Sequence, residues 1–245
     1  LMFCDSAYFY EKTNSLDAFG HVRFVQGDTL RGYGDVLYYN GNSRLARLRN
    51  NVRLEHFSTT LTTDSLNYDR EQDIAWFFSG GTIHDSLNVL SSTWGQYTPY
   101  NNQAVFRDSV DLVNDNFTLS ADSLFYNTSS NIADLIGPTN IVYDKETHIF
   151  STRGWYNTKT EFSMLLNRSV VNNLDGQRLT GDTIYYDKQK GFGKAIGNIE
   201  MKDTVEKITL YGNYCEAYEN EEYGFATDSA LLVDLSEDDY SYMHA

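Results

Sequence analysis

The chain has 245 residues, a formal net charge of −15 and two cysteines, and Tyr, Phe and Trp make up 15% of it. Such an acidic chain argues against nucleic-acid binding, which needs a basic footprint, and against simple attraction to an anionic membrane. No apolar run approaches the ~18–20 residues that would span a bilayer as a helix. Many aromatic residues and only two prolines favour paired β-strands.

The first predicted element is the strand-like stretch MFCDSAYFY, and its pattern returns along the chain. Clearer copies read LTTDSLNYD from Leu61, LSADSLFYN from Leu119 and LTGDTIYYD from Leu179. The aspartates at positions 5, 64, 122 and 182 are 59, 58 and 60 residues apart. A second, degenerate element begins at positions 30, 90, 150 and 210. The unit is therefore about 30 residues in two alternating forms, which indicates a repeat architecture.

Between these copies lie shorter strand-like segments at 18–24, 75–80, 133–138 and 195–202. In the last of them Ala195, Ile199 and Met201 fall on one face while polar residues fall on the other. This alternation is typical of a strand with one buried face. Turn-forming clusters separate the segments and leave no room for crossover helices. We therefore predict an all-β, elongated, solenoid-like antiparallel stack of about sixteen strands, with no helix longer than two turns.

The repeats run almost end to end without a Pro-rich, Ser-rich or charged linker, so we predict a single domain over residues 1–245. The chain starts at Leu1 inside one copy and stops at Ala245 where the next seems due, so we interpret it as a fragment of a longer chain. Cys4 and Cys215 fall in the first and eighth units, about seven strand spacings or ~34 Å apart. We expect no disulfide between them, because a disulfide needs Cα atoms within about 7 Å.

Two stripes are expected inside the stack. Leu and Tyr recur on one face of the Asp-Ser copies, and small residues recur in the other strands, as at Ala133 and Gly137 or Ala195 and Gly197. The small residues have two readings: they let two sheets pack closely, or they leave a lengthwise slot for an apolar ligand. The sequence leaves both open.

Catalytic and metal-binding patterns are not recognisable. The five histidines lack metal-ligand spacing, and no phosphate loop or nucleophile elbow is present. We therefore predict no enzymatic activity, no catalytic residue, no metal site and no cofactor. Asp followed by Ser or Thr and then a small or aliphatic residue is frequent, as at Asp64, Asp122 and Asp182. It is interpreted as a strand entry, with a resemblance to a bacterial O-glycosylation signal as the alternative.

The pairing of an Asp-Ser copy with the following small-residue strand resembles the OstA/LptA family of periplasmic lipopolysaccharide-transport proteins. Residues 119–141 and 179–199 carry the resemblance, and residues 61–83 form a looser copy. The resemblance implies a β-jellyroll whose two sheets enclose an apolar groove for the acyl chains of lipopolysaccharide. It further implies the periplasm of a Gram-negative bacterium, with association with the outer membrane as an additional expectation.

As partners it implies lipopolysaccharide or lipid A, together with other jellyroll transport proteins or further copies of this chain joined head-to-tail through terminal strands near 3–10 and 223–233. An open stack has two unpaired strand edges, which agrees with this. The residues expected to line the groove are Val22, Phe24, Leu66, Tyr68, Leu124, Tyr126, Leu135, Ile141, Ile184, Tyr186, Ile199 and Met201.

Two alternatives remain open at this stage. The first is a β-solenoid that binds or cleaves polysaccharide through an outer face of aromatic residues, with Trp94, Tyr97, Tyr100 and Trp155 as candidates. The second is a structural spacer or adhesin with a filled core. An apolar interior large enough for a ligand would separate the lipid reading from the spacer, and glycan binding without lipid binding would favour the solenoid.

Overall fold

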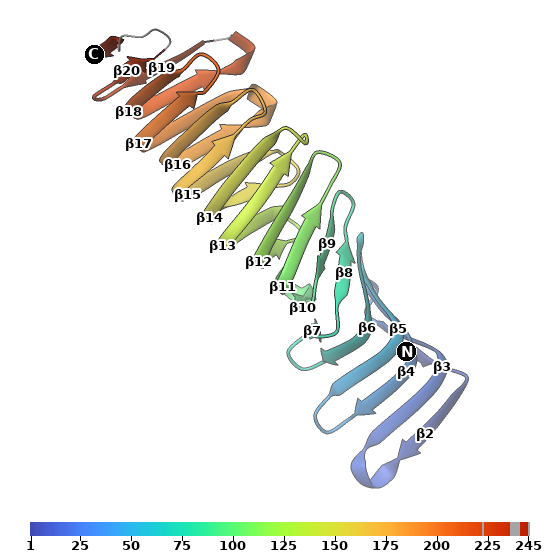
Figure 1. The fold of residues 1–245 in the computed structure, drawn as a ribbon. Coiled ribbons are helices and arrows are strands. Elements are labelled where there is room, and N and C mark those ends of the chain that lie inside the picture. The colour runs from blue at the N-terminus through green and yellow to red at the C-terminus, as the bar shows by residue number, and fades with distance from the viewer. Residues whose placement is uncertain (222, 236–240, 245) are drawn as a thin grey trace. The chain divides into compact units, whose positions relative to one another are not determined.

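The computed structural model describes residues 1–221, 223–235 and 241–244 (Figure 1). These residues fall into two compact units. Unit 1 comprises residues 1–114 and 123–130, and unit 2 comprises residues 115–122 and 131–245. Each unit is treated by itself below. The single domain expected over residues 1–245 stays a prediction.

The predicted all-β, antiparallel fold class is confirmed, because the described residues form 21 strands and no α-helix. Four 3-10 turns occur at Glu11–Thr13, Pro99–Asn101, Lys188–Lys190 and Glu219–Glu221. Among the residues described, no helix is long and apolar enough to cross a membrane. The strands of unit 1 are β1 (Met2–Phe3), β2 (Ser6–Tyr10), β3 (Ser15–Gln26), β4 (Leu30–Asn40), β5 (Leu45–His56), β6 (Thr59–Asp69), β7 (Ile74–Phe77), β8 (Gly81–His84), β9 (Val89–Ser92), β10 (Trp94–Thr98) and β11 (Gln103–Val113).

Residues of β12 (Phe117–Asn127) are divided between the two units. The remaining strands of unit 2 are β13 (Ile132–Tyr143), β14 (Thr147–Asn157), β15 (Phe162–Asn172), β16 (Gln177–Asp187), β17 (Phe192–Asp203), β18 (Ile208–Tyr218), β19 (Tyr223–Thr227), β20 (Leu231–Asp234) and β21 (Ser241–His244).

The strand count exceeds the predicted sixteen because some long strands are interrupted at their middle. β1 and β2 both pair with β3, β7 and β8 both pair with β6, β9 and β10 both pair with β11, and β19 and β20 both pair with β18. Counting each such couple as one strand gives 21 − 4 = 17 among the described residues. The predicted spacing of about fifteen residues per strand and turn therefore agrees with the structure.

A bend at the middle of every second long strand explains these interruptions. Backbone φ angles are positive at Gly20 and His21, at Asn50 and Asn51, and again at intervals of about 30 residues as far as Asp228 and Ser229. The register of the paired strands shifts at the bends of β3, β5, β15 and β17. Such irregularities bend a strand and increase its local twist. The full set of these positions is Gly20, His21, Asn50, Asn51, Gly80, Asp108, Ser109, Gly137, Asn167, Arg168, Gly197, Asn198, Asp228 and Ser229.

The bends change the interpretation of two sequence patterns. Gly137 and Gly197 have φ values of 87° and 78°, so glycine is needed there for its backbone conformation. Ala133 and Ala195, by contrast, are fully buried. The Asp-Ser copies at Asp122 and Asp182 lie inside β12 and β16 rather than at a strand entry. The strand-entry interpretation is therefore wrong for these copies, because the repeating unit is a bent strand.

Within each unit turns stack in two rows, one at each end of the bent strands. The first turn row contains residues 11–14, 41–44, 70–73, 99–102, 128–131, 158–161, 188–191 and 219–221. The second turn row contains residues 27–29, 57–58, 85–88, 114–116, 144–146, 173–176 and 204–207. Backbone hydrogen bonds join successive turns of a row, as from Gly41 N to Asn14 O (2.7 Å) and from Asp144 N to Asn116 O (2.9 Å). Every long strand therefore runs from one turn row to the other.

The terminal strands were expected to have unpaired edges, and the structure agrees with this only in part. Within the described residues, β2 pairs only with β3, and β19 pairs only with β18. β20, however, pairs with β21 as well as with β18. The predicted open edge over residues 223–233 is therefore wrong for β20, because a further strand satisfies its backbone groups.

Candidate functional site

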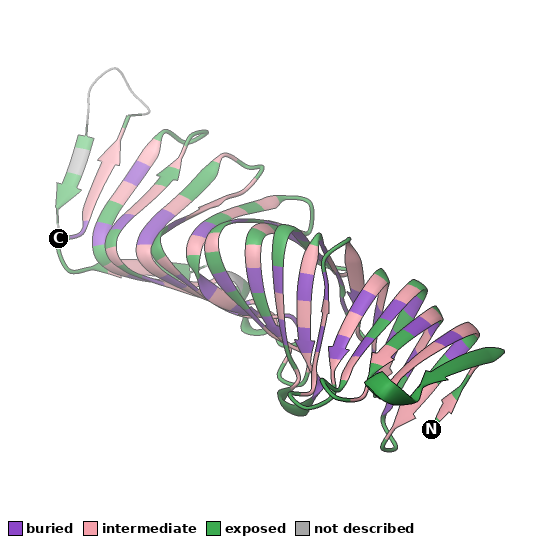
Figure 2. Cartoon of the chain, turned by 90° about the horizontal axis from the view of Figure 1, so that it is seen from below, coloured by how far each residue is buried: buried purple, intermediate pink, exposed green. Residues whose placement is uncertain are grey.

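Contacts between the two turn rows show that each unit folds around an interior. β14 has 11 residues and would be about 36 Å long if it were straight. In unit 2 the ring of Phe117, beside the second turn row, nevertheless lies 4.7 Å from that of Tyr156, beside the first (centroid to centroid). The strands must therefore bend back on themselves, and the bend is visible in Figure 2. Inward side chains of the two half-strands then face each other across this interior.

One wall of the interior carries an aliphatic row, which we define by the cross-strand register. In unit 1 its members are at most 2% exposed, so they are part of a closed core. In unit 2 only its first member, Ile141, is fully buried, and the others are half-buried. The row consists of Leu54, Leu61, Ile83, Leu90 and Leu112 in unit 1, and of Ile141, Ile149, Val171, Leu179, Met201, Leu210 and Leu232 in unit 2.

The opposite wall carries a second row of inward residues, the facing row. The size of its side chains differs between the units. In unit 1 the row presents large, buried side chains from β4 to β11, with Gly95 beside the Phe77 ring, and small residues on β2 and β3, whereas in unit 2 it ends in small ones. The facing row consists of Ala7, Ala18, Leu37, Leu48, Leu66, Phe77, Gly95 and Phe106 in unit 1, and of Leu135, Gly154, Leu165, Ile184, Ala195, Cys215 and Ala226 in unit 2. In unit 2 the side-chain volume on this wall therefore falls toward β19.

Most of the twelve residues predicted to line a groove are buried, and three are half-buried. The half-buried three are Phe24, Tyr186 and Met201. The predicted inward orientation thus fits their burial, whereas a groove between them stays a prediction. The nine buried residues are Val22, Leu66, Tyr68, Leu124, Tyr126, Leu135, Ile141, Ile184 and Ile199.

Polar contacts close the interior of unit 1 between the turn rows. The Tyr126 hydroxyl donates to Asp85 Oδ2 (2.6 Å) and accepts a hydrogen bond from Asn88 Nδ2 (2.8 Å). Likewise the Tyr97 hydroxyl lies 2.9 Å from His56 Nδ1. Sequence reasoning found the tyrosines but missed these partners, which lie 41 residues upstream at Asp85 and His56.

Similar polar contacts close unit 2 near its first strands. The Tyr143 hydroxyl donates to Glu161 Oε1 (3.1 Å), and Asn116 Nδ2 donates to the same oxygen. Lys188 Nζ lies 3.8 Å from Asp144 Oδ2 and 5.1 Å from the centre of the Tyr143 ring. These contacts join turns that precede β17.

The electrostatics of the interior follow from its burial. Desolvation raises the pKa of Tyr97 and lowers that of His56, so both groups are held neutral. Burial, followed by the charge of Glu161, raises the pKa of Tyr156. The Tyr156 hydroxyl is buried and has no hydrogen-bond partner among the described residues. Such an orphaned hydroxyl is costly unless something supplies the missing bond.

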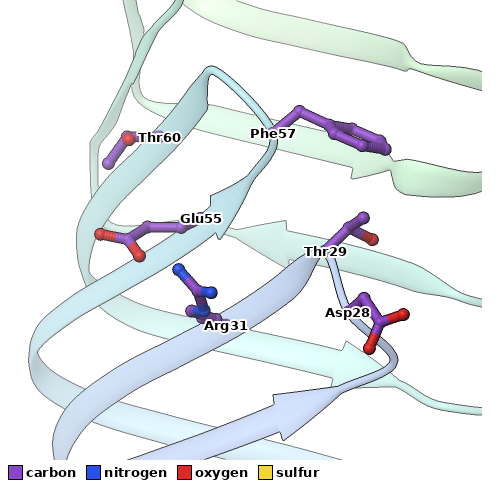
Figure 3. Close-up of a pocket in the computed structure, with 6 residues that line it drawn as sticks. All are labelled: Asp28, Thr29, Arg31, Glu55, Phe57 and Thr60. Carbon is purple, nitrogen blue, oxygen red and sulfur yellow. The ribbon is translucent and has the colours of Figure 1, made fainter.

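A separate pocket of about 380 Å³ lies on unit 1 beside the second turn row (Figure 3). It is not an apolar groove, since five of its six lining residues are charged or carry hydroxyl groups. Its lining consists of Asp28, Thr29, Arg31, Glu55, Phe57 and Thr60.

The aromatic residues proposed for polysaccharide binding do not form one outer face. Tyr97 is buried and points inward, Tyr100 is exposed on a 3-10 turn, and Trp94 is half-buried. Trp155 belongs to unit 2, where its ring lies 5.4 Å from that of Phe162. That expectation is therefore wrong for Tyr97, because the alternation of β10 turns its side chain inward.

Two further features bear on chemistry. Within the part of the chain that the structure describes, no group of three His, Cys, Asp or Glu side chains could hold a metal ion. Cys4 and Cys215 are both free thiols.

Comparison with known proteins gives one family match. Residues 1–122 match the family model described as OstA-like protein, which confirms the resemblance over that segment. Among solved structures the chain is similar to LptH of Pseudomonas aeruginosa, described as the LptA homologous periplasmic component of the conserved lipopolysaccharide transport device. The identity is 17%, the match covers 40% of this chain and 76% of LptH, and the TM-score is 0.38. No curated protein matches the chain.

Proposed function

Because residues 1–122 are OstA-like, we propose that the chain binds lipopolysaccharide by its acyl chains and carries it through the periplasm toward the outer membrane. The observation that carries this proposal is the pair of apolar rows that face each other in each unit. A hydrocarbon chain needs such a surface and no hydrogen-bonding partner, and each buried CH₂ contributes about 0.8 kcal/mol. Binding and passage are the whole role, with no bond made or broken.

Binding to purified lipopolysaccharide tests the proposal. The full chain is incubated with intact lipopolysaccharide, with the same material after removal of its acyl chains, and with the free oligosaccharide. We expect co-purification with the intact form alone. Equal binding of the free oligosaccharide would favour the polysaccharide alternative, and binding of none of the three would favour a spacer with a filled core.

We further propose that copies of this chain, or a jellyroll partner, join end to end through β2 and β19. Each of these strands has one side that no described strand pairs with, and such edges recruit further strands. A head-to-tail contact does not close and can grow into a filament. A photo-crosslinker at Tyr8 of β2 or at Phe225 of β19 should capture a second protein. Capture only from mid-sheet positions would refute this mode of assembly.

A further inference from the structure

The aliphatic row has a different environment in the two units. In unit 1 Leu90 and Leu112 are at most 1% exposed, so no surface remains there for a ligand. In unit 2 Leu179, Met201 and Leu210 are half-buried although they point inward and pair with one another. In unit 1 the same register row is half-buried only at Met2 and Phe24 of β1 and β3, so the uncovered aliphatic side chains are concentrated in unit 2.

Small residues on the opposite wall account for the difference. Facing strands β17, β18 and β19 contribute Ala195, Cys215 and Ala226 near the bend. Nearer the turn row they contribute Gly193, Ala217 and Gly224, which are also aligned. At the corresponding level β6, β7 and β11 of unit 1 carry Leu66, Phe77 and Phe106, and the two rings also occupy the space beside Gly95 of β10. Large side chains therefore close unit 1 over β6–β11, while β17–β19 leave the aliphatic row without a covering partner.

A buried tyrosine hydroxyl without a partner lies on β14, the strand that also carries Ile149 of the aliphatic row. Tyr156 belongs to a register row that continues through Ser163 and Tyr186 to Gly193. Its hydroxyl is buried, at 6% exposure for the residue, and no described group bonds to it. A phenol can donate one hydrogen bond. An ester or amide carbonyl, of the kind that joins an acyl chain to a sugar, would satisfy it.

We propose that unit 2 holds the acyl chain along the half-buried part of the aliphatic row, from Ile149 on β14 to Leu232 on β20, with Tyr156 as donor to its carbonyl. The proposal rests on the function proposed above and narrows its site, since the interior of unit 1 is then a filled core. Six strands with a spacing of about 4.8 Å give a row of about 24 Å. One leaflet of a bilayer is about 15 Å of hydrocarbon, so the row is long enough for one acyl chain.

Single cysteines at equivalent positions of the two rows test this proposal. The full chain with Cys4→Ala and Cys215→Ala receives either Leu210→Cys in unit 2 or Leu90→Cys in unit 1. Alkylation by a small maleimide is followed with and without purified lipopolysaccharide. We expect Leu210→Cys to react readily alone and at least fivefold more slowly with lipid, while Leu90→Cys reacts slowly in both cases. Deacylated lipopolysaccharide should protect neither thiol.

The outcomes separate this proposal from the proposed function. If lipopolysaccharide co-purifies with the chain but Leu210→Cys is not protected, or Leu90→Cys is protected equally, the site is not confined to unit 2. If lipopolysaccharide does not bind at all, the proposed function fails as well. A second pair of variants tests the same site without introduced cysteines. Met201→Glu should weaken lipopolysaccharide binding at least tenfold and Glu200→Gln less than twofold, and similar losses in both variants would overturn the proposal.

Discussion

Asn198 at the bend of β17 donates a hydrogen bond from Nδ2 to Oδ2 of Asp182, on the neighbouring strand β16, over 2.6 Å. The same link recurs sixteen residues apart between Asn51 and Asp35 (2.7 Å), and His21 Nδ1 lies 2.8 Å from Asp5 Oδ2. An aspartate of one strand thus bonds to the positive-φ residue of the next. Two of the recurring aspartates of the sequence, Asp5 and Asp182, are therefore in contact with bend residues.

Gly197 beside this link should tolerate no side chain. Its φ is +78°, and a Cβ there would lie 2.8 Å from Asp182 Oδ2. We expect Gly197→Ala to lower the free energy of unfolding by about 1–3 kcal/mol, measured by urea denaturation. Gly193→Ala is the matched control, because its Cβ would meet nothing closer than 3.9 Å, and it should change stability by less than about 0.5 kcal/mol. Equal losses would show that the bend does not depend on this glycine.

The repeat, the strand faces and the turns could be predicted because their signals are local. Alternation of apolar and polar residues, as over 195–202, decides which face of a strand is buried. Turn positions such as Asp69 and Asn127 accept hydrogen bonds from backbone amides two and three residues later, and this capping depends only on nearby sequence.

The bends and the contacts between turn rows could not be predicted. Asn50 and Asn198 have positive φ values, which asparagine tolerates, but many other asparagines of the chain lie in turns, so the residue type alone does not mark a bend. Tyr126 bonds to Asp85 across 41 residues, and no local pattern marks that pair. Whether an inward leucine is covered depends on which residue faces it. Leu90 and Leu210 occupy equivalent places in the sequence repeat but differ in burial.

An acidic residue in the interior should destabilise the chain strongly. Leu124 is fully buried, and Leu124→Asp would bury a charge without a partner. We expect a loss of more than about 3 kcal/mol in the free energy of unfolding, seen as a large drop in Tm. Glu200 lies on the outward side of β17 and is half-buried, so Glu200→Gln should change Tm little. Comparable drops would mean that the inward and outward faces are assigned incorrectly.

Removal of the hydroxyl group should have opposite effects on stability at two buried tyrosines. The Tyr126 hydroxyl bonds to Asp85 and Asn88, and Tyr126→Phe leaves both without that partner, at a cost of about 1–3 kcal/mol. The Tyr156 hydroxyl is buried and unpaired, so Tyr156→Phe should be neutral or stabilising. Thermal unfolding of the two variants beside the unaltered chain checks this. A loss for Tyr156→Phe as large as that for Tyr126→Phe would contradict it.

Acid should weaken unit 1 through His56. Burial lowers the pKa of His56 in the folded chain, while the unfolded chain protonates it near pH 6.5. Below that pH the unfolded state binds more protons, so stability falls as the pH falls from the unfolded pKa to the lower folded one. We expect His56→Asn to lose less Tm between pH 7.5 and 5.5 than the unaltered chain.

The exposed His84 at the end of β8 provides the control for His56. His84→Asn should keep the full pH dependence of the unaltered chain. If His56→Asn and His84→Asn lose the same Tm between the two pH values, protonation of His56 does not contribute to acid destabilisation.

Cys215 can report on the facing row of unit 2 without any substitution. It is 5% exposed, pairs with Ala195 and Ala226, and burial raises the pKa of its thiol. A raised pKa leaves less thiolate, which is the reactive form, so Cys215 should react with iodoacetamide at pH 8 at least tenfold more slowly than the half-buried Cys4. Its rate should keep rising as the pH passes the usual thiol range. Peptide mass spectrometry at several times gives both rates from one sample, and a pH series gives the profile of Cys215. Equal rates for the two cysteines would show that the wall formed by β17–β19 is open to solvent down to the bend.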